Sequence, residues 1–499
     1  MKACLMFRDR DFETASGLPP GGGDLICDLD LSTLFNAMAS GDAFIRDVAQ
    51  NAVLESLTDT GTILYRQDIL KDCIKNASTV GEIYGIALRA IEKEKKEYFY
   101  MIKGSPSYVL HRSLEVLKMF AQTLRSLRRI ADDAGAFESE GFVRLFAGFR
   151  KDLSDEFFLD VQKHVKELAF REGMLLSARP GKGVIGSGYA LRKPPRKKQK
   201  WLSRVFSKKT GYSYYVREND EAGMDGLYAL KDRGFNIVAN TIAQSNDHIL
   251  SFLNVLRREL AFYIGCVNLH GELAKLKEPC AYPLLFETYE RRHFFCGLYD
   301  PCLALRLRQK VAGNDVCADE KELVVITGAN QGGKSAFLRS IGLSQLMAQC
   351  GMFVSAENFS ANICENVFTH FKRGEDTQMK SGKLDEELFR MDGIVKMLKP
   401  NSLLLFNKSF SATNEREGSE IARQIVRALI EKHIKVFFIT HLYDFAQSFY
   451  EKNMQNAVFL YAERKDDGTR TYKLTEGGPF SSNFGEDLYA QVFEAGNRL

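Results

Sequence analysis

The stretch GANQGGKS at residues 328–335 has the residue types and the spacing of a phosphate-binding loop. Glycines let backbone N–H groups close around phosphate oxygens, a lysine reaches the terminal phosphates, and a serine ligates Mg²⁺. The apolar run ELVVIT precedes the loop and a helical pattern follows it, which is the order that such a site requires. The sequence therefore predicts an ATP–Mg²⁺ site rather than a chance match in a turn, and the pattern GxxxxGK[ST] is satisfied by Gly328, Gly333, Lys334 and Ser335.

A second chemical signal is the stretch LLLFNKSF at residues 403–410. In a P-loop ATPase this kind of apolar strand is normally followed by acids that hold magnesium and activate water, but here Asn407 and Lys408 follow. Asn407 can accept a hydrogen bond from a magnesium-bound water. A protonated Lys408 cannot act as a base, and its charge near the γ-phosphate favours bound ATP. Loss of a positioned base typically removes ~10² to 10⁴ in rate, so we expect ATP binding with very slow or no hydrolysis.

Other residues could contribute to the same site. Thr440 and His441 follow the next apolar run, IKVFFI, where a histidine can sense or polarise the γ-phosphate, although a histidine at a strand end is more often structural. Five acids could replace the missing base, or could be solvated or interface charges: Asp385, Glu386, Glu387, Glu415 and Glu417. A natural and an introduced Lys408 are both compatible with the sequence.

The elements that carry these residues differ along the chain. Between residues 25 and 172 apolar residues recur every three or four positions, as in 110–127, which predicts long amphipathic helices. A second such helix is expected from near Asn236, with a seam close to a heptad repeat over 249–267. From about residue 286 short β-rich runs alternate with helical segments, which is typical of a nucleotide-binding α/β domain.

A basic insertion separates the two helical parts. Residues 173–216 are rich in glycine and proline, and 192–209 hold nine Lys or Arg and no Asp or Glu. A solvated loop without a partner is one interpretation, since charge runs are often only that. The position between long helices favours a phosphate-binding patch for nucleic acid, with aromatic residues interleaved. The predicted DNA-binding residues are Arg192, Lys193, Arg196, Lys197, Lys198, Lys200 and Arg204.

Composition adds only broad limits. The 499 residues suffice for several domains, and the net charge of +4 is uninformative as an average. The ten cysteines form no CxxC pair, so neither a zinc site nor a disulfide framework is indicated. No segment approaches the ~18 uninterrupted apolar residues of a membrane span. We therefore expect a soluble, cytoplasmic protein with reduced thiols.

The C-terminal half resembles the ATPase domain of the MutS family of DNA mismatch-repair proteins. The resemblance is carried by TGANQGGKSAFLRSIGLSQLMAQCG, SGKLDEELFRM, LLLFNKSFSATNEREGSEIA, FITHLYDF and YKLTEGGPFSSNFGEDL, with VAGND at 311–315 upstream. DLDLSTLFNAMASGDAFI (28–45) resembles, more weakly, the start of that family's helical core. The family places Asp and then Glu where this chain has Asn407 and Lys408. Some 25 residues precede the helical core, so we expect no mismatch-reading or connector domain.

The resemblance implies roles for individual residues. Ser335 and Asn407 would lie at the magnesium ion, and Lys408 and His441 would stand at the catalytic positions. Ser381 and Gly382 would approach ATP bound to a second copy, so that two composite sites form across a homodimer. The loop from Ser409 to Gly418 would line that interface. ATP would be bound by Gly328, Ala329, Asn330, Gln331, Gly332, Gly333, Lys334, Ser335 and Ala336, with Val311 and Asn314.

We thus predict a multi-domain protein: an all-α lever and core domain of long helices with a basic clamp-like insertion, followed by an α/β ABC-type P-loop ATPase domain. The expected parts are a flexible lead-in (1–24), a helical core (25–172), the insertion (173–216), a returning helical lever (217–285) and the ATPase domain (286–499). The predicted function is ATP-dependent clamping of double-stranded or branched DNA in repair or recombination. The alternatives are an ATP-gated scaffold that binds protein or RNA without turnover, and, more weakly, an unrelated P-loop transferase.

Overall fold

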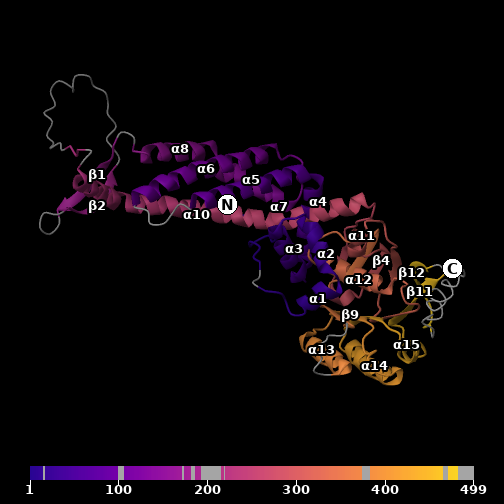
Figure 1. Ribbon diagram of the computed structural model, residues 1–499. Coiled ribbons are helices and arrows are strands. Elements are labelled where there is room, and N and C mark those ends of the chain that lie inside the picture. Colours follow the sequence, from indigo (N-terminus) through magenta and orange to yellow (C-terminus); the bar gives the residue numbers. More distant parts are fainter. Residues whose placement is uncertain are drawn as a thin grey trace, which may run out of the picture. The chain divides into compact units, whose positions relative to one another are not determined.

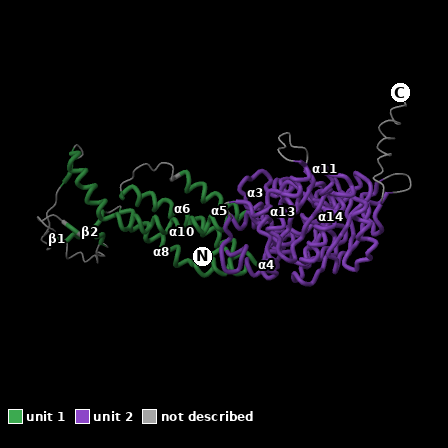
Figure 2. Tube along the Cα trace, turned by 90° about the horizontal axis from the view of Figure 1, so that it is seen from below, with its two compact units in different colours: residues 1–3, 81–137, 143–257 green, residues 4–80, 138–142, 258–499 purple. Residues whose placement is uncertain are grey.

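The computed structural model (Figure 1) divides into two compact units, which Figure 2 shows in different colours. Unit 1 comprises residues 1–3, 81–137 and 143–257, and unit 2 comprises residues 4–80, 138–142 and 258–499. This division differs from the expected domain boundaries, because the first helices of the chain pack with the C-terminal α/β part. The structure describes residues 1–14, 17–98, 106–170, 173–180, 186–192, 215–217, 220–373, 382–464 and 470–480.

Unit 1 is built from long helices and one hairpin. The expected periodicity is confirmed in α6, where Leu110, Leu114, Leu124 and Leu127 are buried. The second long helix, α10, begins earlier than expected and is 55 residues long, so it supplies residues to both units. The described part of the basic insertion forms an antiparallel hairpin. The elements are α5 (Ala77–Tyr98), α6 (Pro106–Asp133), α7 (Glu140–Asp152), α8 (Asp155–Leu168), β1 (Leu175–Pro180), β2 (Gly186–Arg192) and α10 (Glu221–Lys275).

Unit 2 contains two sheets. The larger has the strand order β12-β11-β6-β10-β9-β8, in which all neighbours are parallel except the β11–β12 hairpin. The smaller has the order β3-β7-β4-β5. The strands are β3 (Leu284–Phe286), β4 (His293–Leu298), β5 (Asn314–Cys317), β6 (Leu323–Thr327), β7 (Asn358–Asn362), β8 (Val367–Phe371), β9 (Leu403–Asn407), β10 (Lys435–Ile439), β11 (Ala457–Arg464) and β12 (Arg470–Glu476).

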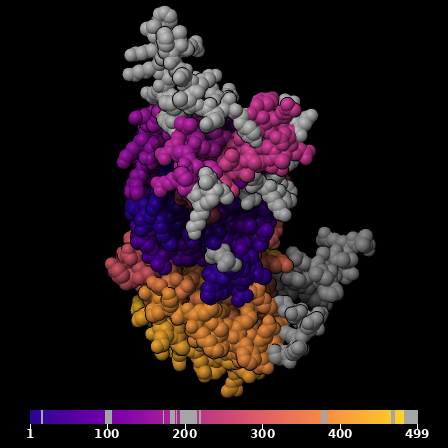
Figure 3. Space-filling view, turned by 90° about the vertical axis from the view of Figure 1, so that its left-hand side faces the viewer, coloured from indigo at the N-terminus to yellow at the C-terminus, as the bar shows by residue number. Residues whose placement is uncertain are grey.

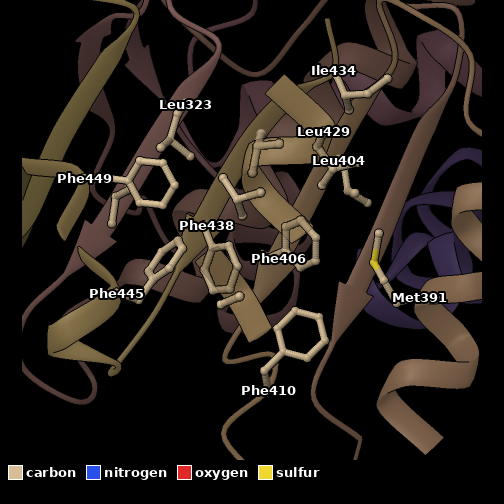
Figure 4. Packing of buried hydrophobic residues seen from close by; sticks show 14 of the residues in the cluster. Leu323, Met391, Leu404, Phe406, Phe410, Leu429, Ile434, Phe438, Phe445 and Phe449 are labelled. Carbon is tan, nitrogen blue, oxygen red and sulfur yellow. The ribbon is translucent and has the colours of Figure 1, made fainter. Parts of the chain in front are cut away.

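Helices cover the larger sheet, which is why its central strands read as continuous apolar runs. Every residue of β6 and β10 is buried. On one face Phe406 of β9 stacks on Phe438 of β10 at 4.7 Å, and Phe438 in turn contacts Phe445 (Figure 4). The helices of unit 2 are α1 (Gly22–Asp28), α2 (Leu31–Ala39), α3 (Ala43–Glu55), α4 (Thr60–Lys75), α11 (Pro301–Leu307), α12 (Lys334–Gln349), α13 (Lys383–Met397), α14 (Glu415–Glu431) and α15 (Tyr443–Tyr450), with a 3₁₀ turn, η2 (Thr288–Glu290). Within the described residues no helix is both long and apolar enough to cross a membrane.

The N-terminal segment differs from the expectation of a flexible lead-in over 1–24. Leu5 and Met6 are fully buried, Phe12 is nearly so, and α1 already begins at Gly22. The helix α1 packs against β8, and in Figure 3 the indigo N-terminal residues adjoin the orange surface of the C-terminal part. The segment is ordered because it packs against α4 and α10. These partners lie far along the chain, so the local sequence does not reveal them.

One of these partners predicts a pH dependence of stability. The carboxylate of Glu259 is fully buried, and burial raises its pKa to about 7. A raised pKa in the folded state means a contribution that is fully present below pH 4.5 and is lost as the pH rises towards 7, by roughly 3 kcal/mol in total. Unfolding free energies from pH 4.5 to 8 should therefore fall more steeply in the wild type than in Glu259→Gln. Parallel slopes would contradict the assignment.

Candidate ATP-binding site

The phosphate loop lies at the carboxyl end of a central strand. β6 runs between β11 and β10, and the loop that follows it leads directly into α12. Gly328 and Gly333 have φ values of 103° and 86°, which only glycine adopts without strain. A Cβ atom on Gly328 would also lie 2.9 Å from the main-chain nitrogen of Ala462. The loop therefore has the backbone shape and the helix N-terminus that a phosphate group requires.

Lys334 is the best defined cation of this site. Its side chain is buried, and its Nζ donates hydrogen bonds to the carbonyl oxygens of Gly328 (2.6 Å) and Ala329 (2.5 Å). Burial, and secondarily the charge of Lys408, lowers the pKa of Lys334 to about 8. The ammonium is thus held inside the loop by two neutral acceptors, and a phosphate anion would be its first charged partner there.

Ser335 and Asn407 meet across the sheet edge. Ser335 is the second residue of α12 and Asn407 is the last residue of β9. The Ser335 Oγ lies 3.4 Å from Asn407 Oδ1 and 3.3 Å from Asn407 Nδ2. A hydroxyl and an amide oxygen are hard ligands that suit Mg²⁺, which keeps several of its waters. These two predicted magnesium residues therefore fit the ion, although within the described ranges no carboxylate forms a hydrogen bond with either of them.

Lys408 stands beside the phosphate loop. Its backbone has a φ of 57° and its N–H donates to the carbonyl of Ile439, which fixes the direction of the side chain. Its Nζ donates to Oδ1 of Asn330 at 3.4 Å. The Oγ of the next residue, Ser409, lies 2.7 Å from Nδ1 of His370. Burial lowers the pKa of His370 to about 4, so this ring is neutral. The structure thus brings Lys408 and the loop residue Asn330 together.

The acids considered as replacement bases have local partners. Glu387 is buried and accepts the backbone N–H of Phe410, and burial raises the pKa of Glu387. Glu415 accepts the N–H of Tyr443 at 2.8 Å, at the start of α15. Glu417 contacts Thr413 and Asn414 at the start of α14. Asp385 and Glu386 lie in the first turn of α13. No contact in the described residues joins these five side chains to the phosphate loop.

His441 lies one residue beyond Thr440, after the end of β10 and therefore at the same sheet edge as the phosphate loop. Thr440 connects this position to β6, because its N–H donates to the carbonyl of Ile326 at 3.1 Å. The Thr440 hydroxyl oxygen accepts the N–H of Leu442 and shapes the turn into α15. His441 is half-buried there.

Val311 and Asn314 are engaged by the protein itself. The Val311 N–H donates to a carboxylate oxygen of Glu278 at 2.7 Å. The amide of Asn314 accepts from the N–H of Leu474 and donates to the carbonyl of Tyr472, both in β12. Their predicted contact with nucleotide stays a prediction, and the observed role of Asn314 is to join β5 to β12.

The contribution of the β11–β12 hairpin to the site was not predicted from the sequence. Arg470 donates to Oε1 of Gln331 in the phosphate loop at 2.6 Å. A Cβ atom on Gly332 would lie 2.7 Å from Cβ of Ala462, and one on Gly333 would lie 3.3 Å from Tyr472. The hairpin thus packs on the loop and adds a guanidinium beside it. The only signal for this contribution in the sequence was the stretch YKLTEGGPF, which begins at Tyr472, two residues after Arg470.

Some predicted site residues fall outside the described residues. Gly382 is described and precedes α13 as its N-cap, whereas Ser381 is not. Arg192 ends β2 and is exposed. The other predicted DNA-binding residues lie outside the described ranges: Lys193, Arg196, Lys197, Lys198, Lys200 and Arg204.

Comparison with known protein families gives two matches. The family described as MutS2 N-terminal domain matches residues 58–276, and the family described as MutS domain V matches residues 324–492. The second range contains the phosphate loop, Asn407, Lys408 and the β11–β12 hairpin. The first contains the long helices and the hairpin β1–β2.

Curated relatives agree with these matches. The DNA mismatch repair protein MutS of Thermotoga sp. (strain RQ2) is 33% identical over 176 residues, which are 34% of this chain and 22% of that protein. MutS of Thermotoga petrophila is 32% identical over 222 residues, or 42% of this chain and 28% of that protein. MutS protein homolog 4 of Mus musculus is 30% identical over 183 residues, covering 35% and 19%. The matched part of this chain thus spans between 19% and 28% of the length of these relatives.

Proposed function

The chain belongs to the MutS family of DNA mismatch-repair proteins, and on this premise we propose that it is a DNA-binding protein whose nucleotide state controls its grip on DNA. ATP and Mg²⁺ bind at the phosphate loop of each copy in a homodimer. Hydrolysis is very slow or absent. The observation that carries the proposal is the complete phosphate-binding geometry around Lys334 and Ser335, combined with a lysine at the position of the water-activating acid.

The residues of this site would each bind a different part of ATP and Mg²⁺. Lys334 leaves its two carbonyl acceptors for the β- and γ-phosphates, where a charged partner strengthens its hydrogen bonds. Ser335 and Asn407 would hold the hydrated Mg²⁺, which neutralises part of the triphosphate charge when bound. Lys408 adds a second cation near the γ-phosphate, next to Asn330. Two cations close together stabilise a triphosphate more than a diphosphate, because the γ-phosphate carries most of the charge that they face.

The same geometry supports slow turnover. A general base must come within hydrogen-bond reach of the attacking water. Lys408 occupies the expected position of that base, and the nearby acids Glu387, Glu415 and Glu417 each hold a local structural partner. ATP would then act as a bound effector that favours the homodimer with both composite sites formed, and it would not be hydrolysed in each cycle of DNA binding.

DNA is the proposed partner of the basic insertion at 173–216. We expect that replacing Arg196, Lys197, Lys198 and Lys200 with glutamine weakens duplex binding and lowers the slope of log K against log salt by about 0.9 for each phosphate that is no longer neutralised. Fluorescence anisotropy of a labelled duplex between about 50 and 200 mM salt measures both quantities.

A matched control neutralises four exposed lysines in unit 2, namely Lys396, Lys399, Lys432 and Lys452. It removes the same charge from the chain, so it separates a local contact from the effect of net charge. If both variants keep the wild-type affinity and slope, the insertion is a solvated loop and does not bind DNA.

Lys408 also favours a second candidate function, an ATP-gated scaffold that binds protein or RNA without turnover. The two functions differ in the salt experiment, because a scaffold for protein would show no DNA affinity to lose. They differ again in whether DNA changes the affinity for ATP, which linkage requires if ATP controls the grip on DNA.

A further inference from the structure

The N-terminal residues Cys4–Phe12 lie between α4 and α10, and the residues that contact them are not those of the proposed ATP site. Leu5 and Met6 are fully buried, and Phe7 and Phe12 are more than nine-tenths buried. The segment forms no strand or helix of its own. Side chains of the two helices hold it in place, and they do so through its main chain.

From α4, two neighbouring residues contact the segment. The hydroxyl of Tyr65 donates to the carbonyl of Cys4 at 2.6 Å, and Nε of Arg66 donates to the carbonyl of Met6 at 2.9 Å. Arg66 is fully buried, and its guanidinium also lies 4.6 Å from the centroid of the Phe7 ring. The guanidinium also pairs with the carboxylate of Glu55 at 3.1 Å, so its charge keeps a partner outside the segment.

From α10, three residues contact the segment. The two carboxylate oxygens of Glu259 accept the N–H groups of Leu5 (2.6 Å) and Phe12 (2.8 Å). The hydroxyl of Tyr263 donates to the carbonyl of Leu5 at 2.6 Å. Arg258 Nη1 donates to the carbonyl of Phe12 at 3.2 Å. Glu259 and Tyr263 are fully buried.

These six hydrogen bonds share one property: each ends on a main-chain atom of the segment. A single carboxylate, Glu259, bridges two N–H groups seven residues apart and so fixes the path of the chain between them. The apolar side chains add anchors, and the rings of Phe7 and Phe12 stack at 6.5 Å. The groove between α4 and α10 therefore binds a peptide that is neither helix nor strand, through the peptide backbone and a few apolar side chains, as peptide-binding sites do.

The composition of the groove also makes release possible. Its walls carry three ionisable side chains, those of Arg66, Arg258 and Glu259, and two tyrosine hydroxyls, which water can hydrate when the segment leaves. An apolar core would collapse instead. The groove residues lie within the range that matches the MutS2 N-terminal domain, whereas the segment lies outside both matched ranges.

We propose that α4 and α10 form a peptide-binding groove and that residues 4–12 are its detachable intramolecular ligand. In this role the segment is a strap that pins the part of α10 from Arg258 onwards to α4. Release of the strap removes the contacts that it makes between α4 and α10, while Asn268 of α10 still donates to the carbonyl of Met38. The groove is then open to a segment with the same apolar spacing. The occupant in the free protein is the chain's own N-terminal segment.

The test uses the full chain with a specific protease site inserted between Gly17 and Leu18, both of which are exposed. The protein folds before the cut, so the strap is in place when it becomes a separate peptide. We expect residues 1–17 to remain bound through gel filtration after cleavage, and an excess of labelled synthetic peptide of the same sequence to exchange with them. Removal of the cleaved segment 1–17 should lower the midpoint temperature of thermal unfolding, and addition of the synthetic peptide should restore it.

Two modified peptides make the test specific. N-methylation at Leu5 and Phe12 removes both N–H groups that Glu259 accepts, and we expect competition to weaken by at least about 100-fold. The matched control is N-methylation at the exposed Asp9, which should change competition by less than about threefold. Immediate loss of the cut segment with no rebinding would overturn the proposal. Equal competition by the two methylated peptides would overturn it as well.

Discussion

Replacement of Lys334 with alanine is expected to weaken ATP binding by about 100-fold or more, since truncating one partner of a buried, hydrogen-bonded charge pair typically costs about 2 to 5 kcal/mol. Lys334 is buried in the loop, and among the described residues only the carbonyls of Gly328 and Ala329 accept from its Nζ. Isothermal titration with ATP and Mg²⁺ measures the loss. Unchanged affinity would mean that the phosphate loop is not the nucleotide site.

A matched control is available in the same sheet. Lys435 is also a buried lysine whose pKa burial lowers to about 8, but it begins β10, at the opposite end of the strand from Thr440. Lys435→Met should affect stability and leave ATP affinity within about twofold, because Lys435 lies at the end of the parallel strands β6 and β10 that is opposite to the phosphate loop. A similar loss of affinity in both variants would point to a general effect of removing a buried charge.

The pH dependence of binding gives an independent check on Lys334. Its pKa of about 8 in the free protein means that the ammonium begins to lose its proton near pH 8, whereas ATP requires the charged form. Affinity should therefore fall as the pH rises above 8, by up to tenfold per pH unit, with proton uptake on binding. Lys408→Ala removes the neighbouring cation that contributes to this low pKa, so the fall should begin at a higher pH in that variant.

Local pattern was enough to predict the elements of the site but not all of their contacts. The glycine spacing of the phosphate loop and the apolar strand before Asn407 are short-range signals, and both appear where they were expected. The contact of Arg470 with Gln331 joins residues 139 positions apart, and no periodicity encodes it. The side-chain amide of Asn314 likewise forms its hydrogen bonds with β12, a strand that lies far along the chain.

The same limit explains the N-terminal residues and the division into units. The glycines and prolines of residues 17–24 led to the prediction of a flexible lead-in over 1–24, but Glu259, which orders Leu5 and Phe12, lies on α10, some 250 residues away. The helices before residue 81 belong to unit 2 because of close packing such as that at Gly342 of α12, where a Cβ would lie 2.8 Å from both Leu29 and Leu405. Helical periodicity locates a helix, but it does not say which neighbour that helix packs against.

Replacement of Lys408 with glutamate is expected to turn a nearly silent ATPase into an active one, with turnover raised by ~10² to 10⁴. The backbone should tolerate the change, because the φ of 57° and the N–H bond to Ile439 do not depend on the side chain. A carboxylate there would supply the base that Glu387, Glu415 and Glu417 are held away from supplying. Phosphate release is measured with and without duplex DNA.

The control for this gain is Lys408→Met, which removes the cation beside Asn330 without adding a base. It should bind ATP more weakly than the wild type and remain as slow, because removing a charge does not orient water. An active Lys408→Glu variant that responds to DNA would mean that one side chain separates this fold from a working ATPase. If that variant binds ATP and stays silent, the scaffold function gains support, since the site then lacks more than its carboxylate. Rapid turnover by the wild type would instead require that another acid reaches the attacking water when ATP and a second copy are bound.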